Sequence, residues 1–278
     1  MSVCVVGRGK VGRALYRALH EAGEPCTLVA GRGLLAGTES VRKLGRHRTF
    51  VFAVPDGSIR ELAEKLAPLL DARVRALHCA GARGVGELGA LRERGVAVAL
   101  FHPLVSFASS RQRSALRGAT FTSLGDRRAT SEAKRLSRRI GARCVVLPEL
   151  SDSEAARYHA AAALVANGAA ALADVAARIL RELGYGQRDA ERALSSLLAS
   201  VAGNVARVGV PAALTGPVVR GDASTVARHL DALAESDQAA SRAYAALQPT
   251  VVASALARGL GSREARAILR TSRAYAAK

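Results

Sequence analysis

The first half of the chain alternates short apolar runs with stretches of helical periodicity. Apolar runs of this length, separated by helices, are typical of a parallel sheet that is covered on both faces. Strands are predicted at residues 2–7, 26–31, 49–54, 74–80, 96–101, 119–124 and 144–147, and helices at 10–22, 58–70, 85–94 and 131–140. This half therefore predicts one doubly wound α/β domain.

The pattern changes at Pro148. From Ser151 the apolar residues recur at helical spacing as far as Gly184, and further helices are expected near 187–208 and 224–233, with one or two more. Glu154 lies three residues after Ser151, which matches a capping box, and Ser58 with Glu61 matches another. We predict an α/β N-terminal Rossmann domain with a mostly parallel sheet at residues 1–148, and an all-α C-terminal domain at residues 149–278.

Composition fits a folded protein in a reducing compartment. The chain has 278 residues, 49% hydrophobic and 23% charged, near the globular averages of about 45–50% and 25%. The four cysteines, Cys4, Cys26, Cys79 and Cys144, form no C-x-x-C pair, which favours reduced thiols over a zinc site or disulfides. No stretch approaches the roughly 18–20 apolar residues of a membrane span, so we expect a soluble, cytoplasmic protein without a metal.

The net charge of +18 is concentrated in the first half. Residues 1–148 carry 26 Lys and Arg against 11 Asp and Glu, whereas the remainder carries 15 against 12. A basic half attracts phosphates of any kind. Aromatic residues make up only 4% and Trp is absent, so stacking surfaces for nucleic acid are scarce and nucleic acid is not the expected partner.

A G-x-G-x-x-G sequence lies between the first predicted strand and the first predicted helix. The first two glycines allow a tight turn and close approach of a pyrophosphate, and the third lets the helix pack on the strand. The alternative is a merely glycine-rich turn. The residues expected to bind a dinucleotide here are Gly7, Arg8, Gly9, Lys10, Val11 and Gly12, with Val54 and Pro55 after the strand predicted at 49–54.

The end of the second predicted strand indicates which dinucleotide is bound. An NAD site usually has an acidic residue there, but this strand ends in Gly31-Arg32. Arg32 favours a 2′-phosphate, and Arg8 adds a second guanidinium nearby. We therefore expect NADP(H) in preference to NAD(H); a solvated loop arginine is the alternative for Arg32.

Motifs in the rest of the chain resemble one protein family. They are AVPD at 53–56, HPLVSF at 102–107, Tyr158-His159 followed by Asn167, and LTGPVVRGD at 214–222 with Thr225 and His229. The set resembles the Rossmann-like reductases that carry a C-terminal domain of unknown function, relatives of pyrroline-5-carboxylate reductase and ketopantoate reductase. The resemblance implies an NADP-dependent reductase.

The resemblance also implies catalytic positions. Related 3-hydroxyacid dehydrogenases and ketopantoate reductases place a Lys and one or two Asn at four-residue steps on the first long helix of the second domain. The matching positions here are His159, Ala163 and Asn167, so His replaces Lys and the first Asn is lost. On a helix His159 and Asn167 lie roughly 80° and about 12 Å apart. They would bracket a ligand, or else be core residues.

Three further residues are candidates for substrate binding. His102 ends a predicted strand, where parallel sheets bind ligands, unless Pro103 merely fixes it there. Arg220 lies between a valine and a glycine, and its fork suits a substrate carboxylate. Asp222 is either a substrate contact or the N-cap of the next helix.

These residues lead to three hypotheses. The first is NADPH-dependent reduction of a small, ketopantoate-like 2-oxo acid at the interdomain cleft, with proton donation or hydrogen bonding by His159. The second is an imine reductase of the pyrroline-5-carboxylate type, with Thr215 or Thr225 as the hydroxyl donor. The third is a non-catalytic NADP-binding regulatory or scaffold protein. Long helices that are apolar on several faces, together with the resemblance, predict a homodimer through the second domain.

Overall fold

The computed structural model describes residues 2–37, 41–108 and 116–276. The chain divides into two compact units, Met1–Ala166 and Asn167–Lys278. The predicted boundary, between residues 148 and 149, is where the last strand gives way to the long helix α6 (Asp152–Glu182). The unit boundary lies further along, inside α6, because the first turns of this helix pack with the sheet through the buried Ala155 and the half-buried Tyr158.

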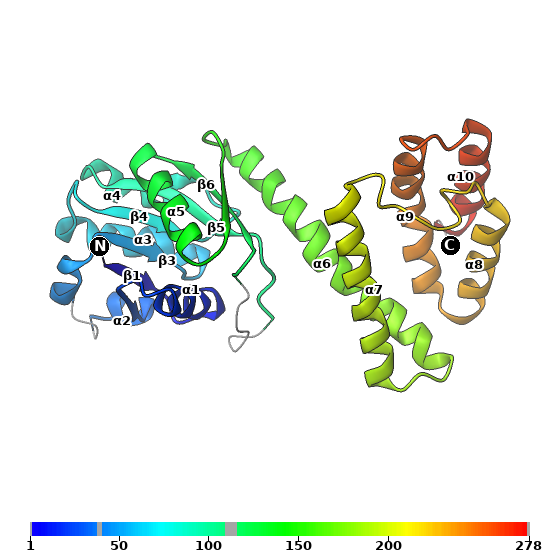
Figure 1. Cartoon of the computed structure of the whole chain (residues 1–278), viewed down its shortest axis with the longest axis horizontal. Coiled ribbons are helices and arrows are strands. Elements are labelled where there is room, and N and C mark those ends of the chain that lie inside the picture. Colours follow the sequence, from blue (N-terminus) through cyan, green and yellow to red (C-terminus); the bar gives the residue numbers. More distant parts are fainter. Residues whose placement is uncertain (1, 38–40, 109–115, 277–278) are drawn as a thin grey trace. The chain divides into compact units, whose positions relative to one another are not determined.

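The first unit contains a seven-stranded sheet in the order β2-β1-β3-β4-β5-β6-β7 (Figure 1). All neighbouring strands are parallel except β5 and β6, which are antiparallel. The predicted mostly parallel, doubly wound sheet is therefore confirmed. The strands are β1 (Val3–Val6), β2 (Cys26–Val29), β3 (Thr49–Phe52), β4 (Arg75–His78), β5 (Ala97–Pro103), β6 (Thr120–Gly125) and β7 (Arg143–Val146).

Helices cover both faces of the sheet because strand side chains alternate between the faces. In β1, Val3 and Val5 join the core beneath α1 (Lys10–Glu21) and α5 (Arg127–Arg139), whereas Cys4 and Val6 join the core beneath α3 (Ile59–Leu66) and α4 (Gly89–Glu93). The four residues of β1 are thus apolar and buried on both faces of the sheet. This burial explains why they appear in the sequence as a continuous run instead of an alternating pattern.

The strand order places a change of direction between β1 and β3. From β1 the chain moves outward to β2 and then returns past β1 to β3. In open α/β sheets the crevice at such a point, outside the carboxyl ends of the strands, binds ligands. The loops after β1, β2 and β3 meet at this edge.

Several local predictions need correction. The helix α2 (Gly31–Leu35) begins where the second strand was expected to end, and α5 begins four residues before the predicted start. The Ser58–Glu61 capping box is wrong, because Ser58 makes no side-chain cap and a short 3-10 turn (Asp56–Ser58) precedes α3.

The other predicted capping box is confirmed. The backbone N–H of Ser151 donates to Glu154 Oε2 at 2.8 Å, and the backbone N–H of Glu154 donates to Ser151 Oγ at 3.3 Å. Two orphan N–H groups at the start of α6 are therefore satisfied reciprocally.

The second unit is helical and has its own core. It contains α7 (Gln187–Val208), α8 (Ala223–Ser236), α9 (Gln238–Leu256) and α10 (Ser262–Ala276). The last three pack together around Val226, Leu230, Val252 and Ile268. Asp222 caps α8 and Asp237 caps α9 through their side chains.

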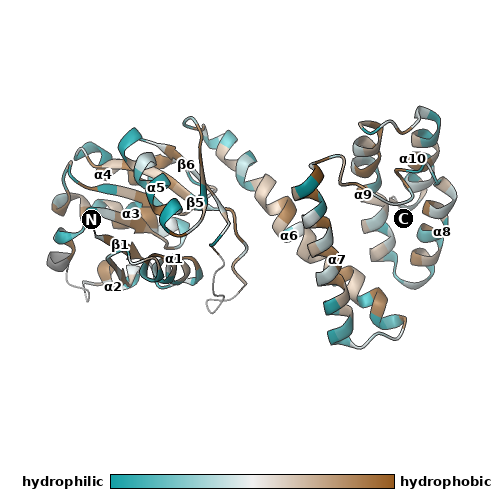
Figure 2. Cartoon of the chain, in the orientation of Figure 1, coloured by the Kyte–Doolittle hydropathy of each residue, from teal (hydrophilic) through white to brown (hydrophobic). Residues whose placement is uncertain are grey.

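Helices α6 and α7 contrast with this core because they bury little (Figure 2). Leu164 and Val165 of α6 are 77% and 74% exposed, and Leu197 of α7 is 61% exposed. By length and composition alone α6 could cross a bilayer, contrary to the prediction that no stretch approaches a membrane span. Among the described residues, both helices therefore present exposed apolar side chains.

Candidate functional site

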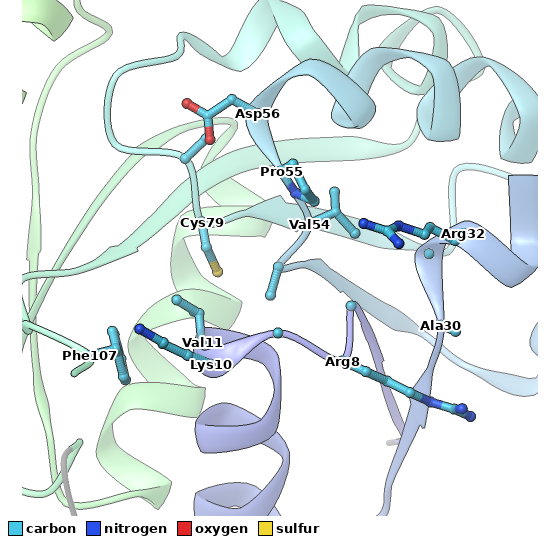
Figure 3. Close-up of a pocket in the computed structure, with 15 residues that line it drawn as sticks. Arg8, Lys10, Val11, Ala30, Arg32, Val54, Pro55, Asp56, Cys79 and Phe107 are labelled. Atoms are coloured by element: carbon cyan, nitrogen blue, oxygen red, sulfur yellow. The ribbon is translucent and has the colours of Figure 1, made fainter. Parts of the chain in front are cut away.

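A cavity of about 750 Å³ opens at the carboxyl edge of the sheet (Figure 3). Its size lies within the range of about 300–1,000 Å³ for small-molecule sites. It is formed within the first unit, by the ends of β1 to β4 and the loop after β5. Its lining residues are Gly7, Arg8, Gly9, Lys10, Val11, Ala30, Gly31, Arg32, Ala53, Val54, Pro55, Asp56, Cys79, Ala80 and Phe107.

The three glycines of the loop have distinct structural roles. Gly7 has φ +125°, and a Cβ there would lie 2.1 Å from the carbonyl oxygen of Ala53. A Cβ on Gly12 would lie 1.9 Å from the carbonyl oxygen of Gly7, so α1 packs against the end of β1 only with glycine. A Cβ on Gly9 would meet no other atom within 4 Å. The loop thus leaves room beside Gly9, at the N-terminus of α1, for a phosphate group.

The cavity lining carries more positive than negative charge. Arg8, Lys10 and Arg32 line it, and among the described residues Asp56 is the one acidic residue of the lining. Figure 3 shows the Arg32 side chain beside Val54 and Lys10 near Phe107. Arg32 stands on the first turn of α2, where the chain leaves β2. The lining therefore suits a ligand with several phosphates.

Sequence reasoning found much of this lining and missed part of it. Of the expected residues Gly12 alone does not line the cavity, because it packs against Gly7 beneath the loop. Cys79 and Ala80 were missed, since they follow β4 and carry no motif, and Phe107 was quoted only as the last residue of the motif at 102–107. Burial raises the pKa of Cys79 to about 12, so its thiol stays neutral. It acts as an apolar wall, since the thiolate is the nucleophilic form.

His102 lies beside this cavity, as the penultimate residue of β5. The register of β4 and β5 puts Ala80 and His102 at the same level of the sheet. Gly81 follows Ala80, and a Cβ on Gly81 would lie 2.6 Å from the His102 ring. The predicted position of His102 at the carboxyl edge is confirmed; its role in substrate binding stays a prediction.

His102 is hydrogen-bonded to a residue of α6. Its Nδ1 lies 2.8 Å from Tyr158 Oη, and the two rings meet edge to face with centroids 5.6 Å apart. Burial, reinforced by the nearby His159, lowers the pKa of His102 to about 4. A neutral His102 can donate or accept a hydrogen bond, but it does not attract a carboxylate by charge.

His159 is exposed and its ring centroid lies 5.9 Å from that of His102. The structure thus brings two of the predicted residues together, and it adds Tyr158 between the motif histidines. Sequence reasoning quoted Tyr158 only as part of the family motif. Its contact with His102 spans 56 residues of chain, and nothing in local periodicity indicates such a pairing.

The remaining candidates lie in the second unit. Asn167 and Arg220 are both exposed. The carboxylate of Asp222 accepts hydrogen bonds from the Thr225 backbone N–H, the Thr225 hydroxyl and the Ser224 hydroxyl. These bonds hold the pKa of Asp222 well below its usual range. Asp222 is therefore an N-cap, and the Thr225 hydroxyl is committed to it.

Among the described residues no group of three or more His, Cys, Asp or Glu could hold an ion.

Comparisons with known proteins agree with the fold. Residues 119–250 match the model of a family described as a domain of unknown function, DUF2520. No curated protein matches the chain significantly. A solved structure from Thermotoga maritima superposes with a TM-score of 0.67 and 23% identity, over 92% of this chain and 99% of that one.

Two further solved structures connect this fold with named reductases. A Bacteroides fragilis protein provisionally named an NADP oxidoreductase has a TM-score of 0.67 and 19% identity, over 91% of this chain and 98% of that one. Plasmodium falciparum pyrroline carboxylate reductase, solved with NADP bound, has a TM-score of 0.59 and 13% identity, over 99% and 98%. The predicted resemblance to such reductases is confirmed for the fold.

Proposed function

We propose that this chain, which carries a DUF2520 domain after a dinucleotide-binding sheet, is an NADPH-dependent reductase. The observation that carries the proposal is the basic cavity at the carboxyl edge, where the space beside Gly9 meets the N-terminus of α1. The fold shared with an NADP-bound pyrroline carboxylate reductase supports the same reading.

The chain's own residues account for the binding of the cofactor. The backbone N–H groups of residues 9–12 would hold the pyrophosphate, since they begin α1 without partners of their own inside the helix. Arg32 would hold the 2′-phosphate, with Arg8 as a second cation. Val54 and Pro55 would contact the adenosine half, and Cys79, Ala80 and Phe107 would form the wall at the other end.

The bound cofactor supplies a hydride. The protein must orient the substrate, keep the nicotinamide ring in place and deliver a proton to the reduced group. His102, Tyr158 and His159 stand together beside the cavity for the last task. Asn167 and Arg220 remain candidates to orient the substrate and bind its carboxylate, and Asp222 supports the turn that carries Arg220.

Two substrate classes suit this arrangement. A small, ketopantoate-like 2-oxo acid is the first, because a basic site favours a carboxylate-bearing substrate. A cyclic imine is the second, supported by the fold shared with pyrroline carboxylate reductase. For an imine, Thr215 is a better hydroxyl candidate than Thr225, whose hydroxyl donates to Asp222.

The deciding experiment measures NADPH oxidation with a panel of 2-oxo acids and cyclic imines. Turnover with one class identifies the bond that is reduced. Tight NADPH binding without turnover on either class would favour a regulatory or scaffold protein. Absence of NADPH binding would overturn the proposal altogether.

We also propose that two copies associate through the helical half. One face of α7 is apolar. It spans an arc of about 100° around the helix axis and consists of Leu197, Leu198, Val201, Val205 and Val208. They are 40–61% exposed, and such a stripe is usually covered in a soluble protein. The four cysteines form no C-x-x-C pair, which supports a reducing, cytoplasmic location.

A further inference from the structure

We infer that Tyr158 donates the proton that completes the reduction, and that His102 positions Tyr158 and returns a proton to it. This inference rests on the proposed function and assigns a catalytic group to it. The sequence candidate for the same task is the neighbouring His159, so the two assignments compete directly.

The position of Tyr158 is fixed by contacts on both sides. The Ser151–Glu154 capping box fastens the first turn of α6, and Ala155, in the next turn, is buried. Tyr158 is half-buried, with its hydroxyl 2.8 Å from His102 Nδ1. Such a phenol has little freedom to swing away, unlike the exposed His159 beside it.

The pair stands next to the cavity wall that would receive the reacting end of the cofactor. Ala80 lines the cavity, and Gly81 lies under the His102 ring with no room for a Cβ. Glycine at this position lets the imidazole lie flat against the chain after β4. The His102 ring therefore lies against the chain that follows Ala80 and also contacts the Tyr158 hydroxyl.

Burial keeps both partners neutral. It lowers the pKa of His102 to about 4, with a further contribution from His159, and raises the pKa of Tyr158. A hydrogen bond with Thr122 opposes the rise for Tyr158. The other titratable ring facing His102 is His78, itself buried and neutral. At neutral pH the phenol thus retains the proton that it must donate.

The chemical step balances. The hydride forms a new C–H bond at the substrate carbon, and the π pair of the C=O or C=N bond moves to the heteroatom. The O–H bond of Tyr158 breaks as its proton joins that heteroatom. The Nδ1 proton of His102 passes to Tyr158 Oη, and His102 Nε2 takes a proton from a water molecule, which leaves as hydroxide. NADPH is oxidised to NADP⁺ and the substrate is reduced.

The test begins with Tyr158→Phe, which removes only the hydroxyl. We expect turnover to fall about 10²–10⁴-fold, the usual range for loss of a general acid. NADPH affinity, followed by fluorescence titration, should stay unchanged. The matched control is Tyr185→Phe, which makes the same change at an exposed tyrosine between α6 and α7 and should keep full turnover.

Two further measurements separate positioning from general damage. The ¹⁵N shift of His102 Nδ1 in an NMR spectrum should move in Tyr158→Phe and stay unchanged in Tyr185→Phe. His102→Asn keeps a hydrogen-bond donor near Tyr158 and should retain more turnover than His102→Ala, because the amide still orients the phenol although it cannot relay a proton.

Each contrary result is distinct. If the wild type is active and Tyr158→Phe is equally active, or if the His102 shift does not move, the inference is wrong and the reductase proposal survives. If His159→Ala abolishes turnover while Tyr158→Phe preserves it, His159 is the donor. A wild-type protein that reduces no member of the panel overturns both the proposed function and this inference.

Discussion

Gly9 and Gly12 lie three residues apart, yet a methyl group at each would meet different surroundings. At Gly12 it would overlap the carbonyl of Gly7, whereas at Gly9 it would enter open space. We therefore expect Gly12→Ala to destabilise the fold by about 1–3 kcal/mol, as overpacking does. Gly9→Ala should fold normally and weaken NADPH binding, because its methyl group stands where the phosphate would approach.

Thermal melts and fluorescence titrations of both variants measure these two effects. Wild-type affinity in Gly9→Ala would show that the phosphate is held elsewhere. An unchanged melting temperature in Gly12→Ala would show that α1 can shift away from β1 at little cost.

Arg32 tests the choice of nucleotide. Arg32→Asp replaces a phosphate-binding cation with an acceptor for a ribose hydroxyl. Hydrogen bonds to charged groups contribute about 1.5–3 kcal/mol, so NADPH affinity should fall about 10–100-fold while NADH affinity is retained or rises. Titration of both cofactors against both proteins gives the ratio.

Arg188→Asp is the control for this charge change, since Arg188 is exposed on the first turn of α7. Equal affinities of the wild type for NADPH and NADH would contradict the role of Arg32. So would an equal loss of NADPH affinity in the control.

His78 links stability to pH. The side chain is fully buried, and burial lowers its pKa from 6.5 to about 4. The unfolded chain therefore takes up a proton first as the pH falls. The contribution of neutral His78 to the free energy of unfolding is fully present above pH 6.5 and is lost between pH 6.5 and about 4. At pH 5 the loss from this residue alone is about 2 kcal/mol.

Urea denaturation at pH 7 and pH 5 measures this loss. In His78→Leu the difference between the two pH values should shrink by about that amount, whereas His20→Leu, at an exposed position of α1, should leave it unchanged. An undiminished difference in His78→Leu would place the acid sensitivity in other groups.

At the scale of elements, the sequence predicted those parts that depend on local periodicity. Each predicted strand exists, and α7 has the predicted bounds. The misses have physical causes. α2 is a single short turn without a periodic apolar face, and α5 begins with Arg127 and Arg128, polar residues that precede its buried Ala129. Ser58 lacks its cap because the 3-10 turn before α3 already pairs the Ser58 N–H with the carbonyl of Pro55.

The candidate site divides in the same way. The glycine loop and Arg32 could be predicted from the sequence, because each depends on residues that are close together along the chain. The contact of Tyr158 with His102 depends on how α6 packs beside β5, which tertiary structure alone determines. Of the two predicted roles of Asp222, the structure shows the N-cap, which depends on local sequence.

The edge of the sheet opposite the cavity holds a buried ion network. Arg135 of α5 binds Glu24 through two nitrogens, at 2.9 Å and 2.7 Å, and also binds Glu132, which accepts from Thr49 at 2.8 Å. Glu24 and Glu132 are only 5% and 6% exposed. Arg135→Met should therefore cost about 3 kcal/mol, since it removes the nearest cation from both buried carboxylates and leaves Glu24 with Arg139 at 3.5 Å and Glu132 with the Thr49 hydroxyl.

Denaturation of Arg135→Met beside Arg138→Met, an exposed position on the same helix, measures this cost. Arg135 lowers the pKa of both carboxyls, so the stability that it provides is present above their ordinary pKa and is lost as the pH falls. The difference in unfolding free energy between Arg135→Met and Arg138→Met should therefore become smaller at acid pH. If this difference did not change with pH, the cost would come from lost packing of the Arg135 methylene groups.

For the whole molecule, the uncovered stripe on α7 predicts self-association. Wild-type protein should sediment as a dimer at micromolar concentration. Leu197→Glu with Val201→Glu should give folded monomers, because two charges would enter the apolar contact. Leu69→Glu, at a 52% exposed leucine of the first unit, should stay dimeric.

A monomeric wild type would refute the association. Recovery of the wild type with lipid vesicles in a flotation assay would instead assign the exposed apolar surface, including that of α6, to a bilayer.

The reversal between β5 and β6 has a consequence for how such a protein can diverge. Every cavity-lining residue that the structure describes precedes β6, whereas Tyr158 comes after it. Substitutions in the first five strands and their loops can change the preferred nucleotide while the segment that carries the phenol stays constant. Descendants of one ancestor could thus exchange one cofactor for another and keep the same acid, provided that the imidazole of His102 is inherited with it.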